Sequence, residues 1–518
     1  MRQFKFLPSP GQKTKVVYMK ILSIIESGFD GTVAEIECQL SNGLPSIIIV
    51  GFANKAVDEA KERLRSAFAS SSLPFPKKRI TVNLAPADVP KNATSFDLAI
   101  AVSILSAAKQ VTVANEPQTA FLGELSLDGS VRPIRGLIGK LLTARKRGIT
   151  TVFVPARNAA QAKLVNELTI YPVKNLYDLY LSLTGAKPLQ ELHSDTPISA
   201  ACTNAPDFAE IVGQNTAKRA LEIAAAGNHN LLLNGPPGTG KSMLAKALPS
   251  ILPPMTREEM LEATHLHSLC SKDYDSLITT RPLRSPHHSA SDTAIIGGGQ
   301  NPRPGEISLA HNGILFFDEF PEFRRTAIEA LRQPLEDGSI TVSRAKETLD
   351  FPARFILIAT ANPCPCGYFD THRNCTCMPA DILRYRRKLS GPIMDRIDLY
   401  TNVEHVEHKR LLEHDAQAET SQTIRKRVMS AREQQAKRSK QRTNSALTNR
   451  DIQAGIGLST NAKQLLDAAG EKLELSPRAY IRTLKVARTI ADLDKSEHIL
   501  TKHIAEAVQY RPMIRTEL

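Results

Sequence analysis

The sequence contains no tryptophan, and aromatic residues make up only 5% of its 518 positions. It therefore offers few rings on which nucleic-acid bases could stack, and a bound nucleic acid would be held mainly through its phosphate backbone. No apolar run approaches the roughly 18 residues of a membrane-spanning helix, and no apolar leader with a cleavage site follows the basic N-terminus. We expect a cytoplasmic protein with no membrane span.

Acidic residues are fewer than basic ones, 53 against 66, which gives a formal net charge of +13. This balance favours a polyanionic partner without establishing one. The excess is concentrated in the basic segment 421–450, where Glu433 is the only acidic residue among Arg425, Lys426, Arg427, Arg432, Lys437, Arg438, Lys440, Arg442 and Arg450. Two interpretations stay open: contact with DNA phosphates, or a solvated helix that links two folded parts.

The chain is too long for one hydrophobic core, so we predict an α/β multidomain fold. Apolar runs and helical patterns divide it into an N-terminal extension (1–18), an α/β domain (19–183), a linker (184–206), a domain with a parallel sheet and crossover helices (207–403) and a helical C-terminal domain (404–518). Met19 is an alternative start to Met1, because the extension carries no motif.

A glycine-rich turn lies between an apolar run and a helical pattern and fits G-x-x-x-x-G-K-S. Its residues are Gly235, Pro236, Pro237, Gly238, Thr239, Gly240, Lys241 and Ser242. Such a turn directs backbone N–H groups, a lysine and a hydroxyl at a polyphosphate and its Mg²⁺ ion. The motif predicts that these residues bind ATP, with Lys241 on the phosphates and Ser242 on Mg²⁺.

Two further strand-like runs end in polar residues. The run Gly-Ile-Leu-Phe-Phe leads into Asp318 and Glu319, and the run Phe-Ile-Leu-Ile-Ala-Thr leads towards Asn362. Beside a phosphate loop, Asp318 is suited to hold Mg²⁺ together with Ser242, and Glu319 to polarise the attacking water. We predict Asn362 as a sensor of the γ-phosphate, because its amide follows a third strand.

Together these motifs resemble those of AAA+ ATPases, and three longer stretches resemble magnesium-chelatase-like proteins of the ComM/YifB family. The stretches are 305–319, 331–338 and 389–399. The resemblance covers almost the whole chain. It implies a P-loop AAA+ domain over 207–403 followed by an all-α lid over 404–518.

The same resemblance assigns roles to two arginines. Arg396 matches the arginine finger that completes a neighbouring subunit's site, and Arg478 matches the sensor-2 arginine of the lid. Arg482 lies one helical turn further on and could share the second role. A surface ion pair with Asp395 or Asp398 is the alternative for Arg396. An arginine finger implies a ring, for which we expect a homo-hexamer.

Two segments resemble parts that such motors project into a ring pore. Residues 338–352 are predicted to form two β-arms around a polar tip with Arg344 and Lys346. An insertion around His287 and His288 is similarly expected to face the pore or a neighbour, and simple exposure in a loop is its alternative.

The seven cysteines are too unevenly spaced for a disulfide framework, because four of them lie between residues 364 and 377. Cys364, Cys366, Cys375 and Cys377 form two C-x-C pairs, which differ from the usual C-x₂₋₄-C spacing of zinc sites. The loop between them could fold back to complete a tetrahedral site and stabilise the segment after Asn362. Structural Zn²⁺ and free or redox-active thiols both stay open.

The first domain resembles the Lon-protease-like, S5-type α/β fold in residues 121–136 and 148–155. That resemblance places Ser95 near the nucleophile, but Ile138 occupies the position of the lysine that would activate it. Lys140 lies two residues further along and would point to another face of a helix. We therefore predict a non-proteolytic domain that serves as a scaffold or as a DNA-interaction module.

The resemblance implies an ATP-dependent DNA motor, a helicase or translocase. It would act on single-stranded or branched DNA and promote branch migration of recombination intermediates during natural transformation. Two other classes stay open: a chaperone-like ATPase that remodels a protein or acts in metal chelation, and an ATP-dependent protease. The cofactors expected are ATP and Mg²⁺.

Overall fold

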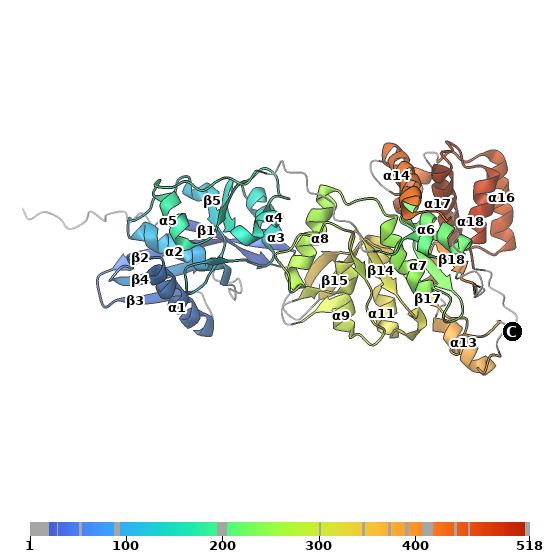
Figure 1. Ribbon diagram of the computed structural model, residues 1–518, viewed down its shortest axis with the longest axis horizontal. Helices are drawn as coiled ribbons and strands as arrows, with labels where there is room; N and C mark the ends of the chain where they lie inside the picture. Colours follow the sequence, from blue (N-terminus) through green and yellow to red (C-terminus); the bar gives the residue numbers. More distant parts are fainter. Residues whose placement is uncertain are drawn as a thin grey trace, which may run out of the picture. The chain divides into compact units, whose positions relative to one another are not determined.

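The computed structural model describes residues 20–27, 29–50, 54–86, 94–193, 205–299, 302–343, 348–370, 374–388, 393–406, 418–439, 443–453 and 456–512. The chain divides after Thr196 into two compact units, and the first unit also includes Asp273–Ser276 (Figure 1). The predicted extension 1–18, Met19 and residues 194–204 of the predicted linker lie outside the described residues. The prediction of a multidomain α/β protein with a parallel sheet and C-terminal helices is confirmed.

The first unit is built on a mixed seven-stranded sheet in the order β3-β4-β2-β1-β5-β8-β9. Strand β2 pairs antiparallel with β1 and β4, and the other neighbours pair in parallel. The strands are β1 (Lys20–Ser27), β2 (Asp30–Ser41), β3 (Ser46–Val50), β4 (Arg79–Ala85), β5 (Thr119–Phe121), β8 (Thr151–Pro155) and β9 (Thr169–Val173).

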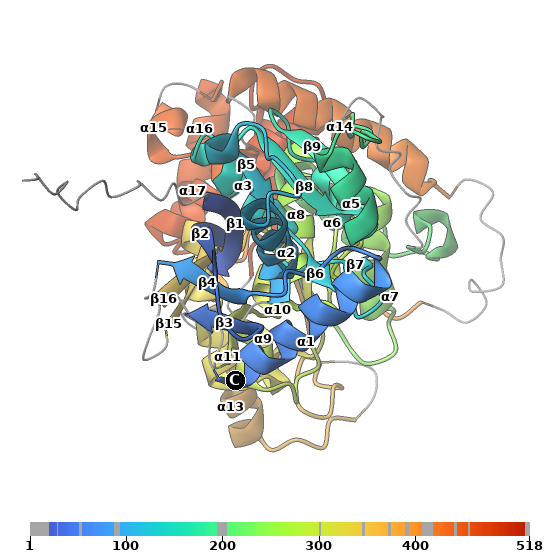
Figure 2. The same ribbon diagram turned by 90° about the vertical axis from the view of Figure 1, so that its left-hand side faces the viewer.

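Helices α2 and α3 pack against β1 and β2 of this sheet (Figure 2). Helix α2 is apolar on every side and therefore buried from Asp97 to Ser106. Arg63 donates two hydrogen bonds of 2.8 and 3.2 Å to Asp97, and burial raises the pKa of Asp97 to about 6. The helices of this unit are α1 (Asn54–Ser70), α2 (Asp97–Ala107), α3 (Leu137–Lys146), α4 (Ala159–Ala162) and α5 (Leu176–Leu183).

The second unit contains a parallel sheet in the order β11-β14-β17-β10-β18. Its strands are β11 (Leu283–Arg284), β14 (Ile314–Phe317), β17 (Ile356–Ala361), β10 (Leu231–Asn234) and β18 (Leu399–Asn402). The short apolar runs of β14, β17 and β10 suit central strands covered on both faces. Because all five strands run in parallel, the loops after β10, β14 and β17 meet at one edge of the sheet.

The helices around this sheet include a capping box in which Thr256 and Glu259 satisfy the first turn of α8. They are α6 (Asn215–Gly227), α7 (Lys241–Ala247), α8 (Arg257–Cys270), α9 (Asp292–Ile296), α10 (Glu306–Leu309), α11 (Arg325–Ala330), α12 (Arg332–Asp337) and α13 (Pro379–Lys388). Two ribbons complete this part: β12 (Gly297–Gly298) with β13 (Arg303–Pro304), and β15 (Ser339–Ser343) with β16 (Thr348–Pro352). The antiparallel pairing of β15 and β16 confirms the two predicted β-arms.

After Asn402 the described chain contains only helices as regular elements. They are α14 (Ser421–Arg438), α15 (Asn449–Gln453), α16 (Thr460–Lys472), α17 (Pro477–Leu493) and α18 (Thr501–Gln509). Helices α14 and α17 pack on α6, so the apolar cores of the sheet and of the helical part are continuous. Of the helices that the structure describes, none is long and apolar enough to cross a membrane.

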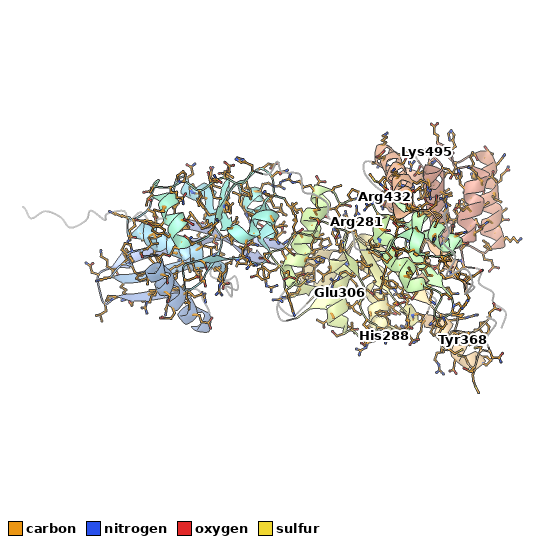
Figure 3. All side chains as sticks on the ribbon, in the orientation of Figure 1. Arg281, His288, Glu306, Tyr368, Arg432 and Lys495 are labelled. Atoms are coloured by element: carbon orange, nitrogen blue, oxygen red, sulfur yellow. The ribbon has the colours of Figure 1, made fainter. Side chains whose placement is uncertain are left out.

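The basic helix α14 uses its long side chains to fasten itself to the sheet domain. Arg432 donates to the carbonyl of Ala225 at 2.7 and 3.1 Å, where α14 meets the last turn of α6 (Figure 3). Arg425 donates to the carbonyl of Leu252 at 2.8 Å, and Arg427 pairs with Glu222. Guanidinium groups here satisfy backbone carbonyls and buried carboxylates that would otherwise lack partners.

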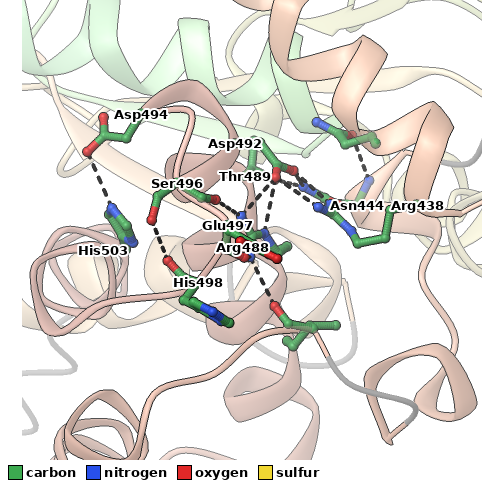
Figure 4. Close-up of polar contacts among 12 residues, drawn as sticks. Arg438, Asn444, Arg488, Thr489, Asp492, Asp494, Ser496, Glu497, His498 and His503 are labelled. Atoms are coloured by element: carbon green, nitrogen blue, oxygen red, sulfur yellow. Dashed lines mark hydrogen bonds and ion pairs between the residues drawn. The ribbon is translucent and has the colours of Figure 1, made fainter.

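A buried charge network joins the helical elements (Figure 4). Asp492 accepts hydrogen bonds from Arg438 at 2.9 and 2.8 Å, from Asn444 at 2.8 Å and from Arg488 at 3.1 Å. Arg488, 1% exposed, also donates to the carbonyls of Ile456, Ser496 and Glu497. Every polar group of the buried pair is thereby occupied, which is the condition under which a buried ion pair is tolerated.

Candidate active site

The glycine-rich turn follows β10 at the carboxyl edge of the parallel sheet. Gly238 and Gly240 have φ angles of +79° and +87°, which glycine adopts without a steric penalty. Gly235 is required for a different reason, because a Cβ atom there would lie 2.3 Å from the carbonyl oxygen of Val403. The turn leads directly into α7, whose first residues are Lys241 and Ser242.

The side chain of Lys241 is folded back onto this turn. Its amine donates to the carbonyls of Gly235 at 2.6 Å and Pro236 at 2.8 Å, and to Oδ1 of Asn362 at 3.1 Å. Burial lowers the pKa of Lys241 to about 8, although Asp318 and Glu319 act in the opposite direction. A dianionic phosphate at this point would raise the pKa of the amine again and so favour its charged form.

Asp318 connects two hydroxyl groups at the end of β14. Its Oδ2 accepts from the hydroxyl of Ser242 at 2.9 Å, and its Oδ1 accepts from the hydroxyl of Thr360 at 2.6 Å. A carboxylate and a serine hydroxyl within hydrogen-bond distance form an oxygen donor set of the kind that Mg²⁺ takes beside a nucleotide. Ser242 and Asp318 therefore fit the predicted Mg²⁺ site.

Glu319 is turned out of the strand by a left-handed backbone with φ of +55°. Its N–H donates to the hydroxyl of Thr360 at 2.8 Å, which stabilises the strained residue, and its side chain is exposed. A non-glycine residue in this conformation costs about 1 kcal/mol and is common where a side chain must be aimed. The carboxylate can therefore meet a water molecule in front of the phosphate loop.

Asn362 lies one residue beyond β17 and is held from two directions. Its side chain accepts from the amine of Lys241, and its backbone N–H donates to the hydroxyl of Tyr385 at 3.3 Å. The structure thus brings the predicted sensor to the phosphate loop. Tyr385 belongs to α13, which follows the cysteine loop.

Arg396 lies at the opposite edge of the sheet from its own phosphate loop. It precedes β18, which is parallel to β10, and its carbonyl accepts from Asn230, which precedes β10, at 3.1 Å. The four residues of β10 span ~13 Å between the two edges, more than an arginine side chain reaches. The side chain is buried and pairs with Glu336, not with Asp395 or Asp398 as the alternative interpretation held.

The two lid arginines differ in their surroundings. Arg482 is anchored on the buried Asp398 at 2.5 Å and on the carbonyl of Arg396 at 3.1 Å. Although burial acts to raise it, the pKa of Asp398 is held well below its usual range by Arg482 and His229. Arg478 is 65% exposed and lies 3.6 Å from Glu336. Of the two, Arg478 is the one positioned to meet another molecule.

In the basic segment 421–450, the structure favours a helix that links two folded parts over contact with DNA. Arg425, Arg427, Arg432 and Arg438 are all bound within the chain. Lys426 and Lys437 are exposed and form no ion pair with any residue that the structure describes. Lys440 and Arg442 lie outside the described residues.

Two arginine pairs connect the segment after α8 to helices α8 and α10. Arg284 donates two hydrogen bonds of 2.6 Å to Glu306, and Arg281 pairs with Glu259. His287 is exposed and its Nδ1 lies 2.8 Å from the hydroxyl of Ser289. His288 stacks beside His287 with 4.1 Å between ring centroids. Arg344 and Lys346 of the predicted hairpin tip lie outside the described residues.

The four clustered thiols do come together: their sulfur atoms all lie within 4.8 Å of one another. His372, which the same loop contains, lies outside the described residues. No other group of metal-ligating side chains is found among the described residues.

In the first unit, the described contacts include no hydrogen bond between Ser95 and Lys140, the residues considered for proteolysis. Ser95 is 4% exposed, and its hydroxyl has no hydrogen-bond partner among the described residues. Ile138 is fully buried in α3, and the amine of Lys140 donates to the carbonyl of Arg135 at 3.0 Å. The amine of Lys140 is therefore hydrogen-bonded to the backbone just before α3.

Three residues that the sequence analysis did not single out support the site. Thr360 bridges Asp318 and Glu319, Tyr385 holds Asn362, and Glu336 contacts both Arg396 and Arg478. Thr360 carried a signal, because it is the polar residue in an otherwise apolar strand. The sequence around Glu336 and Tyr385 gave no indication of their contacts, because only folding brings these residues to their partners.

Comparisons with known proteins match three family descriptions to this chain. "Magnesium chelatase, subunit ChlI" matches residues 207–411, "Subunit ChlI of Mg-chelatase" matches residues 36–158, and "Magnesium chelatase, subunit ChlI C-terminal" matches residues 418–511. Together these matches cover most of both units.

Two relatives are similar over nearly the full length. The competence protein ComM of Haemophilus influenzae is 43% identical over 499 residues, which cover 96% of this chain and 97% of the relative. The uncharacterized protein YifB of Salmonella typhimurium is 44% identical over 481 residues, which cover 93% of this chain and 94% of the relative. A Lon protease of Mycolicibacterium smegmatis is 26% identical over 208 residues, 38% of this chain and 26% of the relative.

Proposed function

The chain belongs to the ComM/YifB family of magnesium-chelatase-like proteins, and on that premise we propose that it is a homo-hexameric, ATP-hydrolysing AAA+ motor that moves DNA. The observation that carries the ATPase proposal is the meeting of Lys241, Ser242, Asp318 and Asn362 at one edge of the parallel sheet. These side chains come from three different strand-to-loop junctions.

Each residue has a part in hydrolysis that follows from its contacts. Lys241 exchanges the carbonyls of Gly235 and Pro236 for phosphate oxygens, and Asn362 then reads the γ-phosphate beside it. Ser242 and Asp318 would hold Mg²⁺, which would supply positive charge beside the phosphates when bound. Glu319 orients the attacking water, because its side chain is exposed directly after Asp318.

The proposal of a ring rests on the position of the arginines. Arg396 and Arg478 lie at the edge away from their own phosphate loop and share Glu336 as a partner. In a ring, this edge would face the phosphate loop of the next subunit. Both arginines would then neutralise charge on a nucleotide bound by a neighbour, with Glu336 holding them until the subunits meet.

DNA is the proposed substrate because a relative that matches over nearly its full length is named as a competence protein. The antiparallel hairpin of β15 and β16 is the element that we propose for contact with a DNA strand. Branch migration of recombination intermediates during natural transformation is the work we propose for the motor. Helix α14 is not assigned to DNA, because its arginines are bound within the chain.

The test is steady-state ATP hydrolysis with single-stranded, duplex and four-way-junction DNA at two salt concentrations. We expect stimulation that fades as salt rises, because each phosphate contact releases counterions with a slope of about −0.9 on duplex DNA. The double variant Arg344→Gln/Lys346→Gln should lose stimulation, whereas Lys426→Gln/Lys437→Gln, with the same change of charge on α14, should keep it. Hydrolysis that no DNA stimulates would favour remodelling of a protein instead.

Hydrolysis itself is tested by Glu319→Gln, which should bind ATP and turn it over at least about 100-fold more slowly. The neighbouring exposed Glu322 provides the matched control, and Glu322→Gln should behave like wild type. Equal turnover in the two variants would contradict the assignment of Glu319.

We propose that the first unit is Lon-like in origin and non-proteolytic. Support comes from Ile138 at the position of the activating lysine and from the contact of Lys140 with the carbonyl of Arg135. Incubation with casein and short fluorogenic peptides should give no cleavage, with or without ATP. Cleavage that disappears in Ser95→Ala would overturn this assignment.

A further inference from the structure

We propose that Cys364, Cys366, Cys375 and Cys377 bind one Zn²⁺ ion, and that this zinc clip holds the sensor Asn362 and the phosphate loop in place. Zinc binding stands on the geometry of the thiols alone. Its consequence for nucleotide rests on the ATPase function proposed above. Separate experiments test the metal site and its effect on nucleotide binding.

The sulfur atoms are already spaced for a tetrahedral ion. The Sγ atom of Cys364 lies 3.3 Å from that of Cys366 and 3.7 Å from that of Cys375, and Cys366 lies 3.5 Å from Cys375. Four thiolates around zinc at about 2.3 Å must lie about 3.8 Å apart. A disulfide would need about 2.05 Å, so these separations match a shared ion far better than a bond between two sulfurs.

Backbone donors surround the sulfur atoms. The N–H of Phe369 donates to Sγ of Cys364 at 3.3 Å, and the N–H of Cys366 donates to Sγ of Cys377 at 3.3 Å. Such donors fix the positions of the sulfur atoms, as hydrogen bonds to metal ligands do. Cys364 is also fully buried, so one of the four sulfur ligands comes from the interior of the protein.

The cysteine loop starts and ends at the sensor. It leaves β17 through Asn362 and returns as α13, whose Tyr385 accepts from the N–H of Asn362 at 3.3 Å. Cys364 and Cys366 lie on the outgoing limb, and Cys375 and Cys377 on the returning limb. Since the described residues between Asn362 and Pro379 form no helix or strand, a cross-link between the limbs would replace the missing secondary structure.

The same loop touches the phosphate loop at a second point. Gly367 has φ of +84°, and a Cβ atom there would lie 2.6 Å from Cδ of Pro237. Gly367 also donates to the carbonyl of Cys364 at 2.9 Å, so its position depends on the cysteine limb. Two contacts, Gly367 with Pro237 and Asn362 with Lys241, therefore connect the thiols to the nucleotide site.

The first experiment measures zinc by mass spectrometry in the full chain purified without chelators. We expect about one zinc ion per chain in wild type and in Cys38→Ser/Cys270→Ser, whose thiols lie outside the cluster, and none in Cys366→Ser/Cys377→Ser. If the last variant does not fold, growth of wild type with cobalt should give the visible absorption of a tetrahedral cobalt thiolate. Wild type without zinc and without that absorption overturns the site.

The second experiment tests the connection with Gly367→Ala. We expect this variant to keep its zinc and to bind a fluorescent ADP analogue about tenfold more weakly, because its Cβ pushes against Pro237. Gly148→Ala is the matched control: Gly148 has φ of +76°, and a Cβ atom there meets nothing within 4 Å. Equal affinity in both variants would overturn the connection.

The outcomes separate the two proposals. If the wild-type protein contains zinc but binds no nucleotide, the ATPase proposal is wrong and the metal site is supported. If the wild-type protein binds nucleotide but contains no zinc, the proposed zinc site is wrong and the ATPase proposal is unaffected. Nucleotide affinity that survives complete removal of zinc by a thiol-competing chelator would contradict the holding role of the ion.

Discussion

The amine of Lys241 lies 3.1 Å from the side-chain oxygen of Asn362, although 121 residues separate the two in the chain. This contact joins the phosphate loop after β10 to the end of the neighbouring strand β17. It places a neutral amide beside the position that a γ-phosphate would take. The side chains proposed for phosphate binding and for sensing are therefore already in contact.

Lys241→Ala should abolish detectable nucleotide binding, because the ammonium group is the only described side-chain cation hydrogen-bonded to the carbonyls of the phosphate loop. Lys246→Ala is the matched control, since Lys246 is exposed on the same helix. Equilibrium binding of a fluorescent ADP analogue measures both. Similar affinities in the two variants would show that the nucleotide binds elsewhere.

Nucleotide affinity should fall at alkaline pH. Burial lowers the pKa of Lys241 from 10.5 to about 8 in the free protein, so its amine loses the proton above that pH. Phosphate binding requires the charged form, and the apparent Kd should therefore rise about tenfold per pH unit above about 8 and stay constant below. A Kd that is unchanged between about pH 7.5 and 9.5 would contradict this account.

Thr360→Val should slow hydrolysis without loss of nucleotide affinity. The substitution keeps the shape of the side chain but removes the hydroxyl that binds Asp318 and the N–H of Glu319. Loss of a hydrogen bond to a charged group, about 1.5 kcal/mol or more, predicts a fall in kcat of at least about tenfold. A fall in affinity with kcat unchanged would mean that Thr360 serves only to hold the fold.

Arg396→Ala should bind nucleotide normally and hydrolyse it poorly, because the arginine lies at the edge away from its own phosphate loop. Mixing it with Lys241→Ala should restore part of the activity: one subunit then supplies the intact loop and the other the arginine. Arg384→Ala, at a side chain 79% exposed, is the control. Mixtures that stay inactive would argue against action between subunits.

Asp492→Asn should destabilise the helical part by about 3 kcal/mol, because it leaves Arg438 and the buried Arg488 without their shared carboxylate. Lys502→Gln is the matched control: its side chain is 63% exposed and pairs with Asp494, so less than about 1 kcal/mol is expected. Hydrogen exchange of the α17 amides measures the difference. Equal protection in both variants would contradict the role of the network.

For two features, the sequence left alternative roles open and the contacts in the structure favour one of them. The basic segment 421–450 was open to DNA contact, but the structure uses Arg427 and Arg432 to bind α14 to α6. Arg482 could have shared the role of Arg478, yet it is held by Asp398. In both cases the charge of a residue is visible in the sequence, whereas its partner is not.

The sequence by itself determined which residues form the proposed nucleotide site and the order of the elements that carry them. Contiguous motifs suffice there, because the glycines of 235–240 and the two carboxylates after Phe317 can each be recognised from their immediate neighbours in the chain. Only the tertiary structure decided which distant side chains meet: Thr360 between Asp318 and Glu319, Glu336 beside Arg396, and four thiols around one point. The physical reason is that parallel strands bring their loops to a common edge in an order set by the sheet, and no local pattern encodes that order.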